Sequence, residues 1–153
     1  MRKLVYLLIV IAPFFSGCKK SQAVIDNEII QNYISTNHLN ATLLGNGLYF
    51  VPISGGNGDY ATTASIVTVT YKGYLTNGAV FDQKTTPTTF DLIDVIPGWG
   101  EGIPAMQKGQ TGMLLIPSAL GYGSTAEASQ GGTYSGIPAN SVLIFNVTLI
   151  SFQ

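Results

Sequence analysis

From residue 48 to its end, the chain is a series of short β-type segments separated by turn signals, and this pattern constrains the fold most. Residues 66–74 (IVTVTYKGY) alternate in polarity and are rich in β-branched side chains. Asn77-Gly78, the strongest short-range hairpin signal, follows them, and Val80-Phe81-Asp82 begins the return strand. We expect further strands over residues 48–53, 90–96, 111–116 and 142–152.

Two helical segments accompany these strands. Residues 98–107 predict a short helix with Pro104 near its first turn, where proline is tolerated. Residues 22–38 predict an N-terminal helix, with Ile25, Ile29 and Tyr33 at helical spacing. A helix of about 17 residues is too short to be stable alone, so it must pack on something. An antiparallel sheet must bury one face, and a single central helix can cover it.

The amino terminus is typical of an export signal. Arg2 and Lys3 precede an apolar run over residues 4–15, which is too short for a membrane span of roughly 20 residues but suits a signal peptide. Ser16-Gly17 then stands before Cys18, the only cysteine, and this resembles a bacterial lipobox, in which the cysteine is lipidated.

Phe15 departs from the leucine favoured in a lipobox, and a plain signal peptide with an incidental cysteine is the alternative. We expect a signal peptide over residues 1–17, an anchor and helical segment over 18–46, and one domain over 47–153.

Composition excludes several kinds of function. Without the leader, five lysines stand against eight acidic residues, so nothing favours nucleic acid as a partner. One cysteine and one histidine (His38) exclude a disulfide framework and a Cys/His metal cluster, and we expect no metal or cofactor. Asp91 with Asp94, or Asp82 with Glu101, could pair as catalytic carboxylates, but no spacing sets either pair across a cleft.

The most distinctive feature is a set of aromatic residues beside turns, and these could simply be core: Tyr71, Phe81, Phe90, Trp99, Tyr122 and Phe145. Their order and spacing match a family. The segments TYKGYLTNGAVFD, VIPGWGEGIPAM, LLIPSALGYG and GIPANSVLIFNVTLI resemble FKBP-type peptidyl-prolyl isomerases over residues 47–153. The resemblance implies an α+β fold, in which a bent antiparallel sheet of five or six strands wraps on one short helix, preceded by an N-terminal helix.

The resemblance also implies a substrate pocket. Trp99 matches the floor under the proline ring, Tyr71 and Phe81 match aromatic walls, and Asp82 matches the pocket carboxylate. The Ile96 amide and the Tyr122 hydroxyl match groups that bind substrate carbonyls. The expected catalytic residues are thus Tyr71, Phe81, Asp82, Ile96, Trp99, Tyr122 and Phe145 (the back wall), and the expected substrate-binding residues are Phe90, Val95 and Ile137 (the closing loop).

The implied function is isomerisation of proline-containing polypeptides, which assists the folding of exported proteins, and macrolide inhibitors of the family could bind. The leader implies lipid anchoring at Cys18 in the cell envelope, periplasmic or outer-membrane. Two departures bear on specificity: an enlarged loop over residues 123–136, and Thr88 where many relatives carry an aromatic residue. A non-catalytic chaperone or peptide-binding module is the main alternative, and a structural lipoprotein with a filled core is a third.

Overall fold

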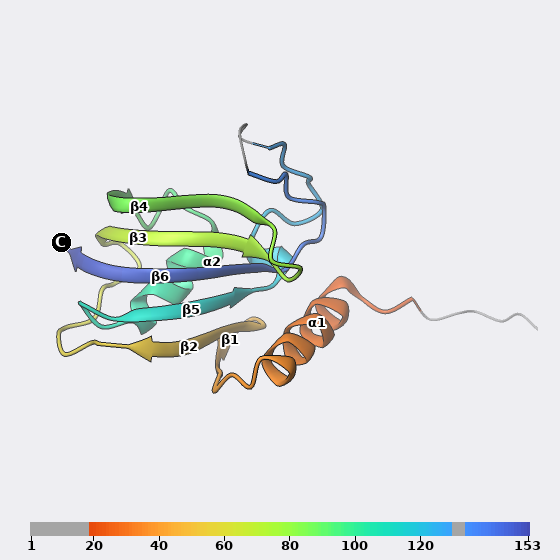
Figure 1. The fold of residues 1–153 in the computed structure, drawn as a ribbon, viewed down its shortest axis with the longest axis horizontal. Helices are drawn as coiled ribbons and strands as arrows, with labels where there is room; N and C mark the ends of the chain where they lie inside the picture. Colours follow the sequence, from red (N-terminus) through yellow and green to blue (C-terminus); the bar gives the residue numbers. More distant parts are fainter. Residues whose placement is uncertain (1–18, 130–133) are drawn as a thin grey trace, which may run out of the picture.

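The computed structural model describes residues 19–129 and 134–153, so the expected signal peptide and Cys18 lie outside the described residues. Six strands form one antiparallel sheet in the order β1-β2-β5-β6-β3-β4 (Figure 1). The elements follow one another along the chain as α1 (Gln22–Thr36), β1 (Thr42–Gly45), β2 (Leu48–Ser54), β3 (Ile66–Leu75), β4 (Val80–Asp91), α2 (Pro97–Gly102), η1 (Ile103–Ala105), β5 (Thr111–Ile116), η2 (Ser118–Leu120) and β6 (Leu143–Phe152).

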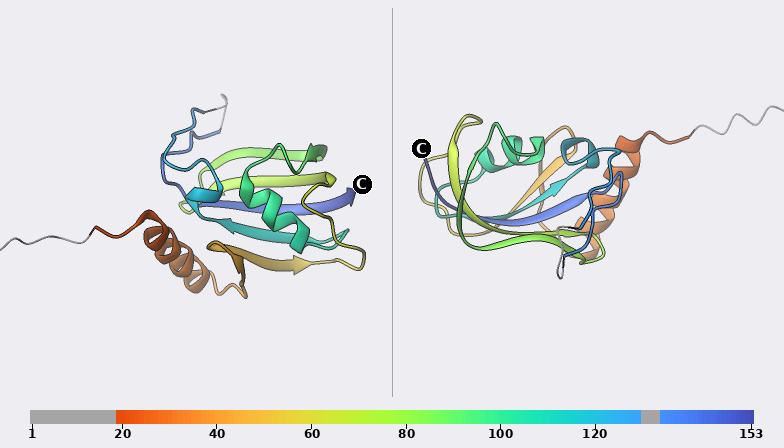
Figure 2. Two further views of the ribbon diagram at one scale, coloured as in Figure 1. Left: turned by 180° about the vertical axis from the view of Figure 1, so that it is seen from behind. Right: turned by 90° about the horizontal axis from the view of Figure 1, so that it is seen from above.

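The sheet bends around α2, and α1 lies at the end of the sheet away from the C-terminus (Figure 2). This arrangement confirms the predicted fold class, with six strands, a short central helix and an N-terminal helix.

Strand β6 shows why both helices are needed. Leu143 and Phe145 belong to the main core with Trp99 of α2, whereas Ile144 belongs to a second cluster with Ile30 of α1. Because successive side chains of a strand point to opposite faces, the apolar run in β6 buries both faces of the sheet.

The predicted hairpin is present between β3 and β4. Gly78 has a φ of +85°, which favours glycine, and its N–H donates to the Leu75 carbonyl at 2.8 Å. The Asn77 side-chain oxygen accepts from the Ala79 N–H at 3.0 Å, so the asparagine closes a local turn of its own.

The structure differs from the expected elements around the short helix. Phe90 does not begin a new strand, because β4 continues through Asp91 and residues 92–96 turn. The Asp91 side chain and carbonyl accept from the N–H groups of Ile93 and Asp94, both at 3.1 Å, and these bonds make the turn.

The predicted helix over residues 98–107 is instead α2 followed by the 3₁₀ turn η1. Pro104 has no N–H to continue an α-helical ladder, which accounts for the change. The short strand β1 was not predicted, and α1 ends at Thr36 rather than at residue 38.

Candidate functional site

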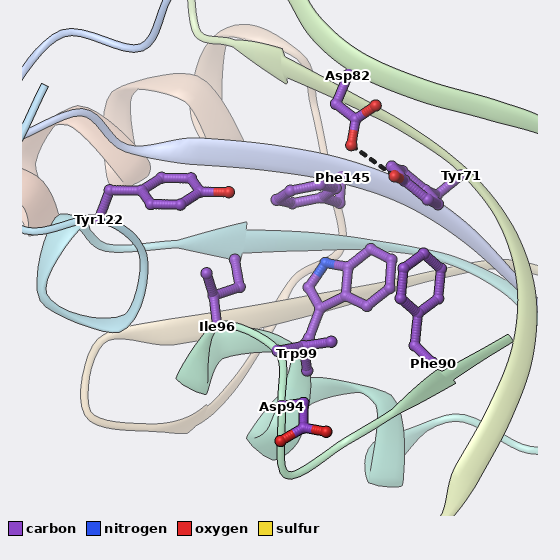
Figure 3. Close-up of a pocket in the computed structure, with 9 residues that line it drawn as sticks. Tyr71, Asp82, Phe90, Asp94, Ile96, Trp99, Tyr122 and Phe145 are labelled. Carbon is purple, nitrogen blue, oxygen red and sulfur yellow. Dashed lines mark hydrogen bonds between the residues drawn. The ribbon is translucent and has the colours of Figure 1, made fainter. Parts of the chain in front are cut away.

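A pocket of about 280 Å³ opens on the concave side of the sheet, beside α2 (Figure 3). It collects residues from β3, β4, the turn before α2, α2, the segment after η2, and β6. Its lining contains eight of the ten predicted site residues and one that was not predicted, Asp94: the set is Tyr71, Asp82, Phe90, Asp94, Val95, Ile96, Trp99, Tyr122 and Phe145.

Trp99 lies at the centre of the pocket and is only 4% exposed. Its indole makes edge-to-face contacts with three rings: Tyr71 at a centroid distance of 5.0 Å, Phe145 at 5.3 Å and Phe90 at 5.5 Å. Such geometry is favoured for aromatic pairs and adds about 0.5–1.5 kcal/mol per pair beyond area burial. These three ring contacts therefore hold the plane of the Trp99 indole in place.

Trp99 also leaves a polar group without a partner. Its Nε1–H is buried and makes no hydrogen bond to any residue that the structure describes. Figure 3 shows the nitrogen on the edge of the indole nearest Ile96 and Tyr122. Buried donors are nearly always paired in native proteins, so this N–H is an exception among the described residues.

Tyr71 and Asp82 form the polar wall. The Tyr71 hydroxyl donates to Asp82 Oδ2 at 2.5 Å, which is shorter than an ordinary hydrogen bond (Figure 3). Burial, this hydrogen bond and the charge of Asp82 raise the pKa of Tyr71 well above that of free tyrosine. The Tyr71 hydroxyl therefore stays protonated and locked to its acceptor.

Gly73 makes room for the aromatic cluster. A Cβ at this position would lie 2.6 Å from Phe81 Cε2 and 2.7 Å from Phe145 Cε1. The ring of Phe145 can thus lie over β3 only because residue 73 has no side chain. Sequence reasoning did not single out Gly73, although an isolated glycine inside a strand often marks such a close approach.

Tyr122 stands at the mouth of the pocket and is 38% exposed. Its hydroxyl points toward Phe145 (Figure 3). Desolvation raises the pKa of Tyr122, and the charges of Glu127 and Asp82 raise it further. The hydroxyl is therefore a neutral donor at physiological pH. Asp94 is exposed, and its carboxylate points away from the rings.

Two predicted site residues do not line the pocket. Phe81 is 3% exposed and packs behind Phe145 at a centroid distance of 5.3 Å. A register shift in the β3–β4 pair, where Gly73 pairs with Asp82 and Tyr74 with Val80, leaves Phe81 unpaired as a bulge.

Ile137 is buried at 7% exposure, and its backbone exchanges two 2.8 Å hydrogen bonds with Glu127. This pairing ties the residue after the enlarged loop to Glu127 within that loop, and Ile137 does not line the cavity. Residues 130–133 of the loop are outside the described residues.

The described residues contain no group of three or more His, Cys, Asp or Glu side chains that could hold a metal ion. Within the same part of the chain, no helix has the length and apolar character needed to cross a membrane. The groups that the pocket presents include its aromatic rings, the two tyrosine hydroxyls and the Asp82 carboxylate.

Comparison with known proteins gives concordant results. A FkpA isomerase from Buchnera aphidicola (subsp. Baizongia pistaciae) is 41% identical over 110 residues, which are 70% of this chain and 41% of that protein. The chain therefore spans less than half the length of this relative.

Two solved structures are also similar. The isomerase from Pseudomonas syringae superposes with a TM-score of 0.69 at 26% identity, covering 88% of this chain and 98% of that one. FkpA from Escherichia coli gives a TM-score of 0.69 at 32% identity, covering 84% and 60%.

A family model described as FKBP-type peptidyl-prolyl cis-trans isomerase matches residues 58–150, a range that holds every residue lining the pocket. Because this match spans more than half of the chain, the protein belongs to the FKBP-type peptidyl-prolyl cis-trans isomerase family.

Proposed function

We propose that this protein catalyses the cis–trans isomerisation of peptide bonds that precede proline. The observation that carries this proposal is the aromatic pocket, in which Trp99 is held edge-to-face by Tyr71, Phe90 and Phe145. A cavity of about 280 Å³ suits a proline ring and the peptide groups beside it.

The chemistry requires no proton transfer. Rotation about the bond has a barrier of about 18–20 kcal/mol because amide resonance must be broken. An enzyme accelerates rotation when it binds the twisted amide better than the planar one. The twisted carbonyl has lost conjugation and tolerates desolvation better, so a dry aromatic pocket favours it.

The pocket residues then have distinct roles. Trp99 supports the proline ring, and Tyr71, Phe90 and Phe145 confine it. Fixed donors bind the carbonyls on either side of the rotating bond, and we assign this role to the Tyr122 hydroxyl and the Ile96 amide. Val95 completes the wall beside Ile96. Asp82 orients Tyr71 through their hydrogen bond and is not a base.

Phe81 and Ile137 act one layer further out in this proposal. Phe81 supports Phe145 from behind, at a centroid distance of 5.3 Å. Ile137 fixes the base of the loop over residues 123–136, which we propose influences the choice of substrate.

A peptide isomerisation assay tests the proposal. The full chain is added to a short Xaa-Pro peptide, and the return to the cis/trans equilibrium is followed after a solvent jump. The test variant Tyr122→Phe removes one donor, and we expect kcat/KM to fall roughly twofold to tenfold, the usual value of one hydrogen bond.

Tyr60→Phe is the matched control, because Tyr60 is 56% exposed and does not line the pocket. Peptide binding without catalysis by the unaltered chain would contradict the proposal and favour a non-catalytic binding module.

We further propose that the protein is exported and held in the cell envelope by a lipid on Cys18, with residues 18–46 leading to the isomerase domain over residues 47–153. The support is the sequence: a basic start, a short apolar run and Ser16-Gly17 before the only cysteine. Its substrates would then be the proline-containing segments of exported proteins that fold near the membrane, and macrolide inhibitors of the family would compete for the same pocket.

A further inference from the structure

A buried carboxylate links the N-terminal helix to the isomerase pocket. Asp26 is only 1% exposed, although it lies on α1, a helix with many polar residues. Its Oδ2 accepts from the Ser118 N–H at 2.8 Å and from the Ser118 Oγ–H at 2.6 Å. Its Oδ1 accepts from Gln22 Nε2 at 2.7 Å.

These hydrogen bonds satisfy a group that would otherwise be costly to bury. An unpaired buried carboxylate is strongly unfavourable, and hydrogen bonds to a charged acceptor are about twice as strong as neutral ones. Among the described residues, an exposed ion pair joins Lys20, which precedes α1, to Glu28 of α1, and it does not include Asp26. Neutral donors therefore hold Asp26, and two of the three belong to Ser118.

Ser118 in turn holds the backbone on both sides of Tyr122. Its carbonyl accepts from the Gly121 N–H at 3.0 Å and from the Gly123 N–H at 2.8 Å. The side chain between these two glycines is the pocket tyrosine. Ser118 is itself 2% exposed, so its N–H, hydroxyl and carbonyl are all committed inside the protein.

We propose that Asp26 is a positioning residue for the isomerase site: it fixes Ser118, and Ser118 fixes the turn that carries the Tyr122 hydroxyl. The helix α1, which precedes the region matched by the family model, then helps to position a pocket residue without lining the pocket. The inference rests on the proposed function for its effect on catalysis. The ordering of the Tyr122 turn by Asp26 can be measured without any activity.

The test variant is Asp26→Ala, which leaves the two Ser118 donors without an acceptor. Glu28→Ala is the matched control, because it removes a carboxylate from an exposed position two residues further along α1. Asp26→Asn is the conservative variant, since its amide oxygen can still accept from Ser118. If Asp26→Ala does not fold, Ser118→Ala replaces it, because it removes only the hydroxyl donor.

Amide hydrogen exchange measures the structural step. In Asp26→Ala we expect the Gly121 and Gly123 amides to exchange about tenfold faster or more, as expected for the loss of charge-assisted hydrogen bonds. The Leu149 amide, which donates to the Gln110 carbonyl at 2.9 Å in the sheet, should change much less. Equal acceleration at all three amides would mean that Asp26 only stabilises the whole fold, and would overturn the proposal.

A double-mutant cycle measures the catalytic step. Asp26→Ala should lower kcat/KM by no more than Tyr122→Phe does, and Asp26→Asn should restore part of the loss. In the Tyr122→Phe background, Asp26→Ala should have an effect of less than about twofold, because both changes act through one hydroxyl. Fully additive losses would overturn the proposal. An inactive parent chain would instead refute the proposed function, and the exchange experiment would still decide whether Asp26 orders the turn.

Discussion

The substitution Gly73→Ala tests whether the aromatic pocket depends on a missing side chain in β3. The added methyl group would lie 2.6 Å from Phe81 Cε2 and 2.7 Å from Phe145 Cε1, well inside van der Waals contact. Both rings are buried, at 3% and 4% exposure, so neither can move into solvent without exposing apolar surface. Phe145 is the ring that lines the pocket, and it must shift toward Trp99 or away from it.

The expected loss of stability combines two opposing effects. Overpacking a core by one methyl group destabilises by about 1–3 kcal/mol. Replacing a strand glycine with alanine recovers roughly 0.5–1 kcal/mol, because the unfolded chain loses freedom. We therefore expect Gly73→Ala to lower the free energy of unfolding by about 0.5–2 kcal/mol, measured by urea denaturation. The protein should remain folded at 25 °C.

Gly112→Ala is the matched control. Gly112 is also a strand glycine without a positive φ, and its added Cβ would overlap a phenylalanine ring, that of Phe50. Gly112 does not line the pocket, so this variant should lose similar stability while retaining kcat/KM. Gly73→Ala should lose activity and shift the fluorescence of Trp99, the only tryptophan. Equal activity of the two variants would show that the position of Phe145 does not matter for catalysis, which would refute this reasoning.

Three further outcomes are expected. Burial and Asp82 raise the pKa of Tyr71, and burial raises that of Tyr74, so above about pH 10 the unfolded chain releases protons that the folded protein retains. The free energy of unfolding should therefore fall as the pH rises above about 10, and it should fall less steeply in Tyr71→Phe. Urea denaturation at a series of pH values measures this, and the absence of a fall would contradict the raised pKa values of the two tyrosines. The rate of isomerisation should be nearly independent of pH from about pH 6 to 9, and Asp82→Asn should keep partial activity in the peptide assay. A steep dependence of the rate on pH that Asp82→Asn abolishes would identify Asp82 as a base. Cys18→Ser should prevent acyl labelling and release the protein from membranes in a fractionation experiment, and a variant that stays acylated would exclude the lipobox.

Local signals in the sequence were sufficient for much of the fold. The hairpin at Asn77-Gly78 depends on residues next to one another, and the alternation over residues 66–74 reports directly which face of β3 is buried. The run from Phe90 to Ile96 was misleading, because its apolar residues fit a strand equally well. In the structure the Asp91 side chain accepts a hydrogen bond from the Ile93 N–H at 3.1 Å, which favours a turn over a strand. The amino-acid composition of the segment does not show which acceptor a backbone N–H will have.

The pocket was predictable to the extent that the family resemblance carried it, residue by residue. The inner walls, such as Tyr71 and Trp99, come together as expected. Phe81 does not line the cavity: it packs behind Phe145 at a centroid distance of 5.3 Å, beside a bulge in the β3–β4 pair, and bulges leave no clear sequence signal. The Asp26–Ser118 contact was not predictable either, since it joins residues 92 positions apart on elements whose packing only the tertiary structure defines.

Exchange spectroscopy by NMR tests the central claim most directly. A peptide with one Xaa-Pro bond gives separate cis and trans signals, because uncatalysed exchange takes tens to hundreds of seconds. With a substoichiometric amount of the full chain, we expect exchange cross-peaks between the two forms at an unchanged cis/trans ratio, and we expect Tyr122→Phe to weaken them. Shifted peptide signals without exchange cross-peaks would mean that the pocket binds proline peptides and does not catalyse their isomerisation, which would contradict the account.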